Sequence, residues 1–178
     1  MKRSLTKIKL LGTTAALILS LLLTSCGTKI LYLNDTQLYK KIYLQNLHIV
    51  ESYEDEETAL STISPARRAV YILSIFDMEV QNGGLCQFFV NSSRSLAPYV
   101  NECLEMMGAH EHKKLFSEFV TENNIDLEDL ESFQSDTIDE YIAQTKRYDF
   151  DSFDDAYVRL TPLQNYIVTY FKTHLSEF

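Results

Sequence analysis

Residues 79–93 read EVQNGGLCQFFVNSS, and this stretch organises the rest of the chain. An apolar helical segment, Pro65 to Val80, precedes it, and a second apolar run follows its two glycines. The sequence Asn82-Gly83-Gly84 is predicted to end the first helix, because glycine adopts the left-handed conformation of a helix terminus without a steric penalty. Gln87 to Asn91 then restarts a segment with an apolar face.

Polar residues recur at multiples of four in this stretch, at Glu79, Gln87 and Asn91. If the two helical pieces are nearly collinear, these three side chains lie on one face. One interpretation is structural: Asn82 caps the helix end, while Gln87 and Asn91 satisfy buried backbone groups. The other is a small polar pocket that holds a ligand or a side chain of a partner. The candidate pocket residues are Glu79, Asn82, Gly83, Gly84, Gln87 and Asn91.

The pattern E-x-x-N-G-G-x-x-Q-F-F-x-N-S-S resembles the signature of the DNA-mimic protein family, a group of small bacterial domains. The named member of that family is an acidic helical protein that presents carboxylates in place of phosphates to a transcription factor. The resemblance extends over roughly Asp35 to Phe178, and it implies a helical fold and a protein-binding role. The chain departs from the family pattern at Arg94, where a glycine is expected, and at Cys86, where polar residues are common.

The first 25 residues have the layout of a secretory signal peptide. Four basic residues lie among the first nine, and a mostly apolar run from Leu10 to Leu23 follows them. The junction Leu23-Thr24-Ser25-Cys26 resembles the bacterial lipobox, in which a signal peptidase cleaves before the cysteine and its thiol carries diacylglycerol. The alternative is an uncleaved membrane helix, because the apolar stretch is near the spanning length of about 20 residues.

The lipoprotein interpretation divides the chain into a signal peptide over 1–25, a lipid anchor and tether over 26–34, and an acidic helical domain over 35–178. Cys26 is the expected lipidation site and the expected link to the membrane. Gly27, the second mature residue, is not the aspartate associated with inner-membrane retention in some bacteria. We therefore expect a place in the cell envelope, at the outer membrane if the cell has one and otherwise on the outer face of the plasma membrane.

The formal net charge of the chain is −9, and removing the leader with its four positive charges takes it to −13. Such a domain repels nucleic acid and anionic membrane surfaces, so we expect a basic protein or peptide as the partner and no direct binding of nucleic acid. Carboxylates are densest between Glu118 and Asp155, where only Lys146 and Arg147 oppose them. The alternative is a solvated acidic face that keeps the protein soluble. The candidate binding residues are Glu118, Glu122, Asp126, Asp129, Asp136, Asp139 and Glu140.

Helical spacing of apolar residues dominates residues 35–178, and no segment alternates convincingly as a strand does. Ser64-Pro65 and Thr161-Pro162 each combine a helix cap with a proline, which predicts a helix start. Gly108 is predicted to end a helix that Ser93 or Ser95 begins, and a short acidic helix is expected around Leu127 to Phe133. These signals predict an all-α fold, with a single compact domain of about eight or nine helices.

Evidence for catalysis is weak. Asp149 to Leu160 lacks the glycine and the glutamate that an EF-hand loop needs at its sixth and twelfth positions. His110 and His112 are two residues apart, which points their rings away from each other on a helix, so no metal site or cofactor is predicted. Cys86 and Cys103 are expected to be buried thiols, with a disulfide as the alternative. The alternative function is an enzyme or small-ligand receptor built around Glu79, Gln87 and Asn91.

Overall fold

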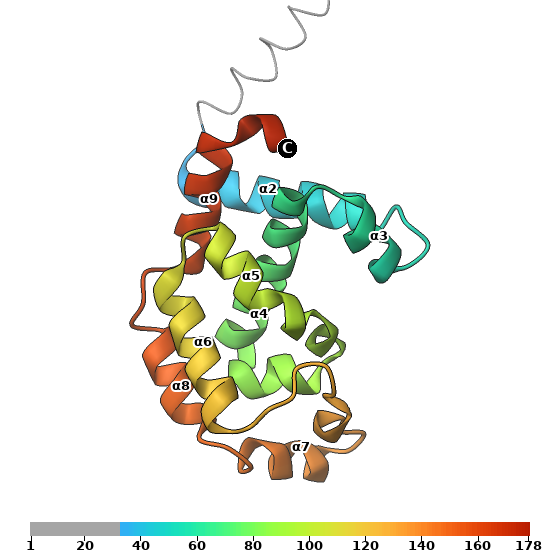
Figure 1. Ribbon diagram of the computed structural model, residues 1–178, viewed down its shortest axis with the longest axis vertical. Helices are drawn as coiled ribbons and strands as arrows, with labels where there is room; N and C mark the ends of the chain where they lie inside the picture. The colour runs from blue at the N-terminus through green and yellow to red at the C-terminus, as the bar shows by residue number, and fades with distance from the viewer. Residues whose placement is uncertain (1–32) are drawn as a thin grey trace, which may run out of the picture. The chain divides into compact units, whose positions relative to one another are not determined.

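The computed structural model describes residues 33–178, and the regular structure in that range is entirely helical (Figure 1). This confirms the predicted all-α class. The signal peptide, the lipidation site Cys26 and most of the tether lie outside the described residues. Among residues 33–178 no helix combines the length and the apolar character needed to cross a membrane.

Eight α-helices and three short 3₁₀ helices follow one another in the described part of the chain. Their bounds are α2 Asp35–Val50, α3 Glu56–Thr62, α4 Pro65–Val90, η1 Ser92–Leu96, α5 Ala97–Met106, α6 His110–Glu122, η2 Glu131–Phe133, α7 Ile138–Thr145, α8 Phe150–Tyr157, α9 Leu163–Thr173 and η3 Leu175–Glu177.

By its internal contacts the chain divides into a unit of residues 1–38 and a unit of residues 39–178. The described end of the first unit begins α2, where Asn34 and Gln37 exchange hydrogen bonds. The Gln37 backbone N–H donates to Asn34 Oδ1 over 2.9 Å, and the Asn34 backbone N–H donates to Gln37 Oε1 over 3.1 Å. This reciprocal pair satisfies two donors at the helix start. The second unit holds the helices that position the candidate sites.

Helix α4 is the central element of the second unit and contacts α5, α7, α8 and α9. It begins as predicted: Ser64 Oγ accepts a hydrogen bond from the Arg67 backbone N–H, and Pro65 occupies the first turn. Its buried aromatic rings build the core. The Phe76 ring meets the Phe88 ring edge-on at 5.1 Å and the Phe116 ring at 5.4 Å. Because Phe76 lies before Gly83 and Gly84 and Phe88 lies after them, one core joins the two halves of α4.

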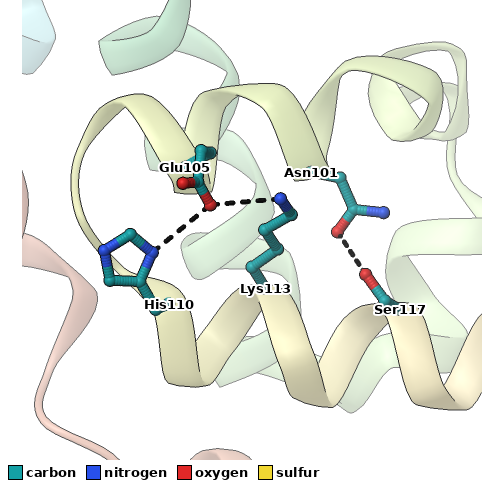
Figure 2. Close-up of polar contacts among 5 residues, drawn as sticks. All are labelled: Asn101, Glu105, His110, Lys113 and Ser117. Atoms are coloured by element: carbon teal, nitrogen blue, oxygen red, sulfur yellow. Dashed lines mark hydrogen bonds and ion pairs between the residues drawn. The ribbon is translucent and has the colours of Figure 1, made fainter.

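Helices α5 and α6 are joined by a tight turn at Gly108, whose φ is +73°. The Gly108 backbone N–H donates to Glu105 O and the Ala109 backbone N–H donates to Leu104 O, so both close the end of α5. This confirms the predicted helix end at Gly108. Polar pairs then link the two helices, and Figure 2 shows Glu105 between Lys113 and His110 and Ser117 donating to Asn101. These pairs run in opposite order along the two helices, so α5 and α6 are antiparallel.

Three predicted helix boundaries were wrong in detail. Neither Ser93 nor Ser95 caps α5, because both lie within η1 and the cap position belongs to Leu96. Pro162 occupies the cap of α9 rather than its first turn, so that helix starts one residue later than its sequence signal indicates. The acidic helix expected around Leu127 to Phe133 is reduced to η2, a single turn.

Candidate functional site

The Asn-Gly-Gly sequence interrupts α4 where the sequence predicts one helical segment to end and another to begin, and the two segments meet there at a kink. Gly83 has φ −149° and ψ 20°, and Gly84 has φ 78° and ψ 177°. The positive φ therefore belongs to the second glycine. This combination at Gly84 lies in a region that only glycine populates readily. Leu85 resumes the helix immediately, which places Gln87 and Asn91 beyond the kink.

Asp154 of α8 packs against the kink at Gly84. Its Oδ1 accepts a hydrogen bond from the Leu85 backbone N–H over 2.8 Å. A Cβ atom on Gly84 would overlap this carboxylate and lie 2.8 Å from its Cγ, so the close approach depends on glycine. Burial raises the pKa of Asp154 above its usual range. The sequence groups Asp154 with the exposed acids, whereas the structure shows it as a half-buried acceptor for the interrupted helix.

The polar residues of the motif meet across the kink around the Glu79 carboxylate. Gln87 Nε2 and Asn91 Nδ2 both donate to Glu79 Oε2, over 2.6 Å and 2.9 Å. Ser93 Oγ donates to Glu79 Oε1 over 3.2 Å. We call Glu79, Gln87, Asn91 and Ser93 the Glu79 cluster. Because Glu79 lies before the kink and its three donors lie after it, the cluster ties the two halves of α4 together.

Of the predicted pocket residues, Asn82 alone lines one of four cavities that lie among residues 39–178. That cavity has a volume of about 290 Å³ and is also lined by Tyr39, Ser74 and Asp77. Glu79, Gln87 and Asn91 line none of the four. Asn82 itself is exposed and is not a partner of Glu79. The geometry therefore gives the Glu79 cluster a bracing role within α4.

Residues 118–155, which we call the acidic segment, run from the end of α6 through η2 and α7 to α8 (Figure 1). All seven candidate binding residues in it are exposed. Among the described residues, Glu122, Asp129 and Asp139 make no side-chain hydrogen bond or ion pair with another described side chain. The seven exposed residues are Glu118, Glu122, Asp126, Asp129, Asp136, Asp139 and Glu140.

Some charges of the acidic segment serve local structure. Glu140 accepts from the Asp136 and Thr137 backbone N–H groups over 2.7 Å and 3.0 Å, which starts α7 and lowers the Glu140 pKa. Asp149, considered above as a calcium ligand, instead caps α8 by accepting from the Ser152 backbone N–H. The Arg147 guanidinium, one of two basic groups in the segment, lies 5.2 Å from the Phe133 and Tyr148 ring centroids.

Among the residues that the structure describes, the cysteines and histidines show no sign of nucleophilic or metal chemistry. Cys86 and Cys103 are buried and unpaired, and burial raises their pKa values to about 11 and about 12. Buried thiols with raised pKa values are poor nucleophiles. His112 is buried while His110 is exposed, so their rings diverge as the spacing predicts. Residues 33–178 contain no group of three His, Cys, Asp or Glu side chains placed to hold a metal.

The Asp77 carboxylate of α4, which is 4% exposed, is among the buried polar groups that sequence reasoning missed. The available signal was an aspartate inside the otherwise apolar face of Ala69 to Val80. Its partner Tyr157 lies 80 residues away in sequence, and no local pattern links the two.

The comparisons with known proteins bear on the same region. The comparisons with curated proteins and with solved structures found no match. The family model described as "DMP19-like protein" matches residues 61–174. The match includes the kinked α4, the Glu79 cluster and the whole acidic segment, and it begins later and ends earlier than the resemblance over Asp35 to Phe178 suggests. Because the matched residues make up more than half of the chain, this protein belongs to the DMP19-like protein family.

Proposed function

We propose that this protein is a lipid-anchored, non-enzymatic binding module whose acidic helical domain binds a basic protein or peptide. The observation that carries the proposal is the exposure of all seven candidate carboxylates of the acidic segment. Membership of the DMP19-like family supports a role similar to DNA mimicry, in which carboxylates take the places of DNA phosphates.

The charge of the acidic segment is large enough to direct an encounter. It contains 13 Asp and Glu residues against Lys146 and Arg147. A field of one sign raises the rate of association with an oppositely charged partner more than it strengthens the final contact. Such attraction is screened by salt, because the Debye length falls from about 10 Å at 0.1 M to about 3 Å at 1 M. The proposal therefore predicts binding that is fast at low salt and weak at high salt.

The proposed location restricts the class of partner. Cleavage before Cys26 and lipidation of its thiol would place the domain outside the inner membrane, and several acyl chains would make the anchor stable. Export would separate the domain from the DNA-binding proteins of the cytoplasm. We therefore expect a basic protein or peptide of the cell envelope, bound by the same chemistry that a DNA mimic uses.

An enzyme or small-ligand receptor centred on the Glu79 cluster is less well supported. Both Glu79 oxygens already accept hydrogen bonds from Gln87, Asn91 and Ser93. A general acid or base must reach a substrate proton at hydrogen-bond distance. Three of the roughly four acceptor positions of the Glu79 carboxylate are therefore already in use, and Glu79 lines none of the four cavities described above.

The test uses a fourfold variant of the acidic segment, with Asp126, Asp129, Asp136 and Asp139 changed together to asparagine. It leaves Glu140 in place because that residue starts α7. A matched control changes four exposed glutamates outside the segment to glutamine, which gives the same change in net charge. The control positions are Glu51, Glu54, Glu57 and Glu111.

Each lipidated variant is used to capture proteins from envelope extracts at 0.1 M and 1 M salt. We expect the fourfold variant to lose the proteins that the wild type retains, mainly through slower association, while the control keeps them. The proposal would be contradicted if the fourfold variant captured the same proteins as the wild type and if 1 M salt did not reduce their capture.

A further inference from the structure

Asp77 is a buried carboxylate whose hydrogen-bond partners are neutral. The Tyr157 hydroxyl donates to it over 2.8 Å from α8, and Gln81 Nε2 donates over 2.7 Å from the next turn of α4. Both bonds end on Oδ1, which leaves Oδ2 for a further donor. A buried charge without a countercharge is costly, so its presence calls for a compensating group.

A cavity of about 260 Å³ opens beside Asp77, where side chains of α4, α6, α8 and α9 meet. Its polar lining comprises Asp77, Gln81, His112, Tyr157 and Gln164. We call this space the Asp77 cavity. Its apolar lining includes Leu160, Leu163 and Val158, and Val158 is 73% exposed at the cavity edge.

The groups around the Asp77 cavity hold unused hydrogen-bonding capacity. His112 is 2% exposed, and its Nδ1 has no hydrogen-bond partner among the described residues. Unpaired buried polar atoms are rare in folded proteins and often mark a place for a ligand or a water molecule.

The charge state of the cavity favours a cation. Burial lowers the pKa of His112, so this imidazole is neutral at neutral pH. Burial and the Asp77 charge raise the pKa of Tyr157, which keeps its hydroxyl protonated as a donor. The remaining polar groups, Gln81 and Gln164, are uncharged amides. Asp77 therefore supplies the one negative charge on a lining that is otherwise neutral.

We propose that the Asp77 cavity binds an alkylammonium or guanidinium group, with Asp77 Oδ2 as its counterion and the apolar wall against its alkyl chain. A free small amine and a lysine or arginine side chain of a protein partner offer the same chemistry. The inference does not depend on the acidic segment, because Asp77 lies outside residues 118–155.

The test measures binding of n-butylammonium to the full chain in non-ionic detergent by titration calorimetry, with n-butanol and butyrate as the neutral and anionic probes. Asp77→Asn removes the charge and keeps an acceptor for Tyr157, and Asp151→Asn on the exposed face of α8 is the matched control. A charged hydrogen bond of this kind predicts that Asp77→Asn raises the Kd for n-butylammonium by about ten- to a hundredfold. Asp151→Asn should leave that Kd unchanged.

A second probe, Nα-acetyl-lysine N-methylamide, distinguishes the two sources. If it binds as n-butylammonium does, the cavity accepts a lysine side chain of a partner, and if only n-butylammonium binds, the cavity takes a free amine. The proposal is overturned if Asp77→Asn binds n-butylammonium as the wild type does, or if n-butanol binds equally well.

If Asp77→Asn does not fold, nuclear magnetic resonance on the wild type decides. The side-chain amide signals of Gln81 and Gln164 should shift with added n-butylammonium and not with butyrate. Unmoved signals would overturn the proposal.

Discussion

Replacing Gly84 by alanine tests the reasoning about the kink in α4. A non-glycine residue at φ 78° and ψ 177° is strained by about 1–3 kcal/mol. The new Cβ would also push aside the Asp154 carboxylate, which accepts from the Leu85 backbone N–H. Leaving that buried donor unsatisfied costs a further ~1–3 kcal/mol. The expected loss in the free energy of unfolding is therefore roughly 2–6 kcal/mol, from a typical total of about 5–15 kcal/mol.

Thermal unfolding followed by circular dichroism measures this loss, and a domain of this size should show a fall in Tm of roughly 5–20 °C. Gly108→Ala is the matched control, because Gly108 also has a positive φ of 73° but has open space where a Cβ would lie. Gly108→Ala should lower the free energy of unfolding only by the cost of a left-handed backbone at a non-glycine residue, about 1–2 kcal/mol. If Gly84→Ala is no more destabilising than Gly108→Ala, the contact with Asp154 is not what requires glycine.

Three further predictions follow from particular side chains. Gln87→Ala and Asn91→Ala each remove one donor from Glu79 and should lower the free energy of unfolding by about 1 kcal/mol in urea titrations; unchanged midpoints would argue against a brace. Because burial lowers the folded-state pKa of His112 from 6.5, the unfolded chain takes up its proton first, so stability should fall as pH drops below about 6.5. In unfolding titrations between pH 7 and pH 5, the stability of His112→Phe should depend less on pH than that of the wild type. If the stability of the variant falls as steeply with pH, His112 is not the group responsible. Cys26→Ala should abolish metabolic labelling with fatty acid, and undiminished label would rule out Cys26 as the lipidation site.

The sequence predicted the helical class well because the signals for it are local. Ser64-Pro65 and Gly108 mark helix ends through side-chain and backbone preferences that act within one turn. The position of the α4 break was predicted for the same reason. Which glycine takes the positive φ was not predictable, because Asp154 from α8 packs on Gly84 and leaves no room for a side chain.

The candidate sites were predicted less completely, since they depend on distant partners. The multiples-of-four spacing of Glu79, Gln87 and Asn91 predicted that these side chains share a face, and the structure brings them into contact across the kink. Spacing alone could not show that Ser93 completes the cluster, or that both oxygens of the Glu79 carboxylate then accept hydrogen bonds. The Asp77 network joins residues 80 positions apart, so only the folded chain reveals it.

Competition with duplex DNA tests the central claim most directly. Proteins captured at 0.1 M salt by the lipidated wild type are challenged with increasing duplex DNA, and the fourfold variant of the acidic segment serves as the comparison. If exposed carboxylates stand in for phosphates, duplex DNA should displace the partner, and the fourfold variant should retain little of it at any DNA concentration. A partner that stays bound against excess duplex DNA and binds the fourfold variant as tightly as the wild type would contradict the account.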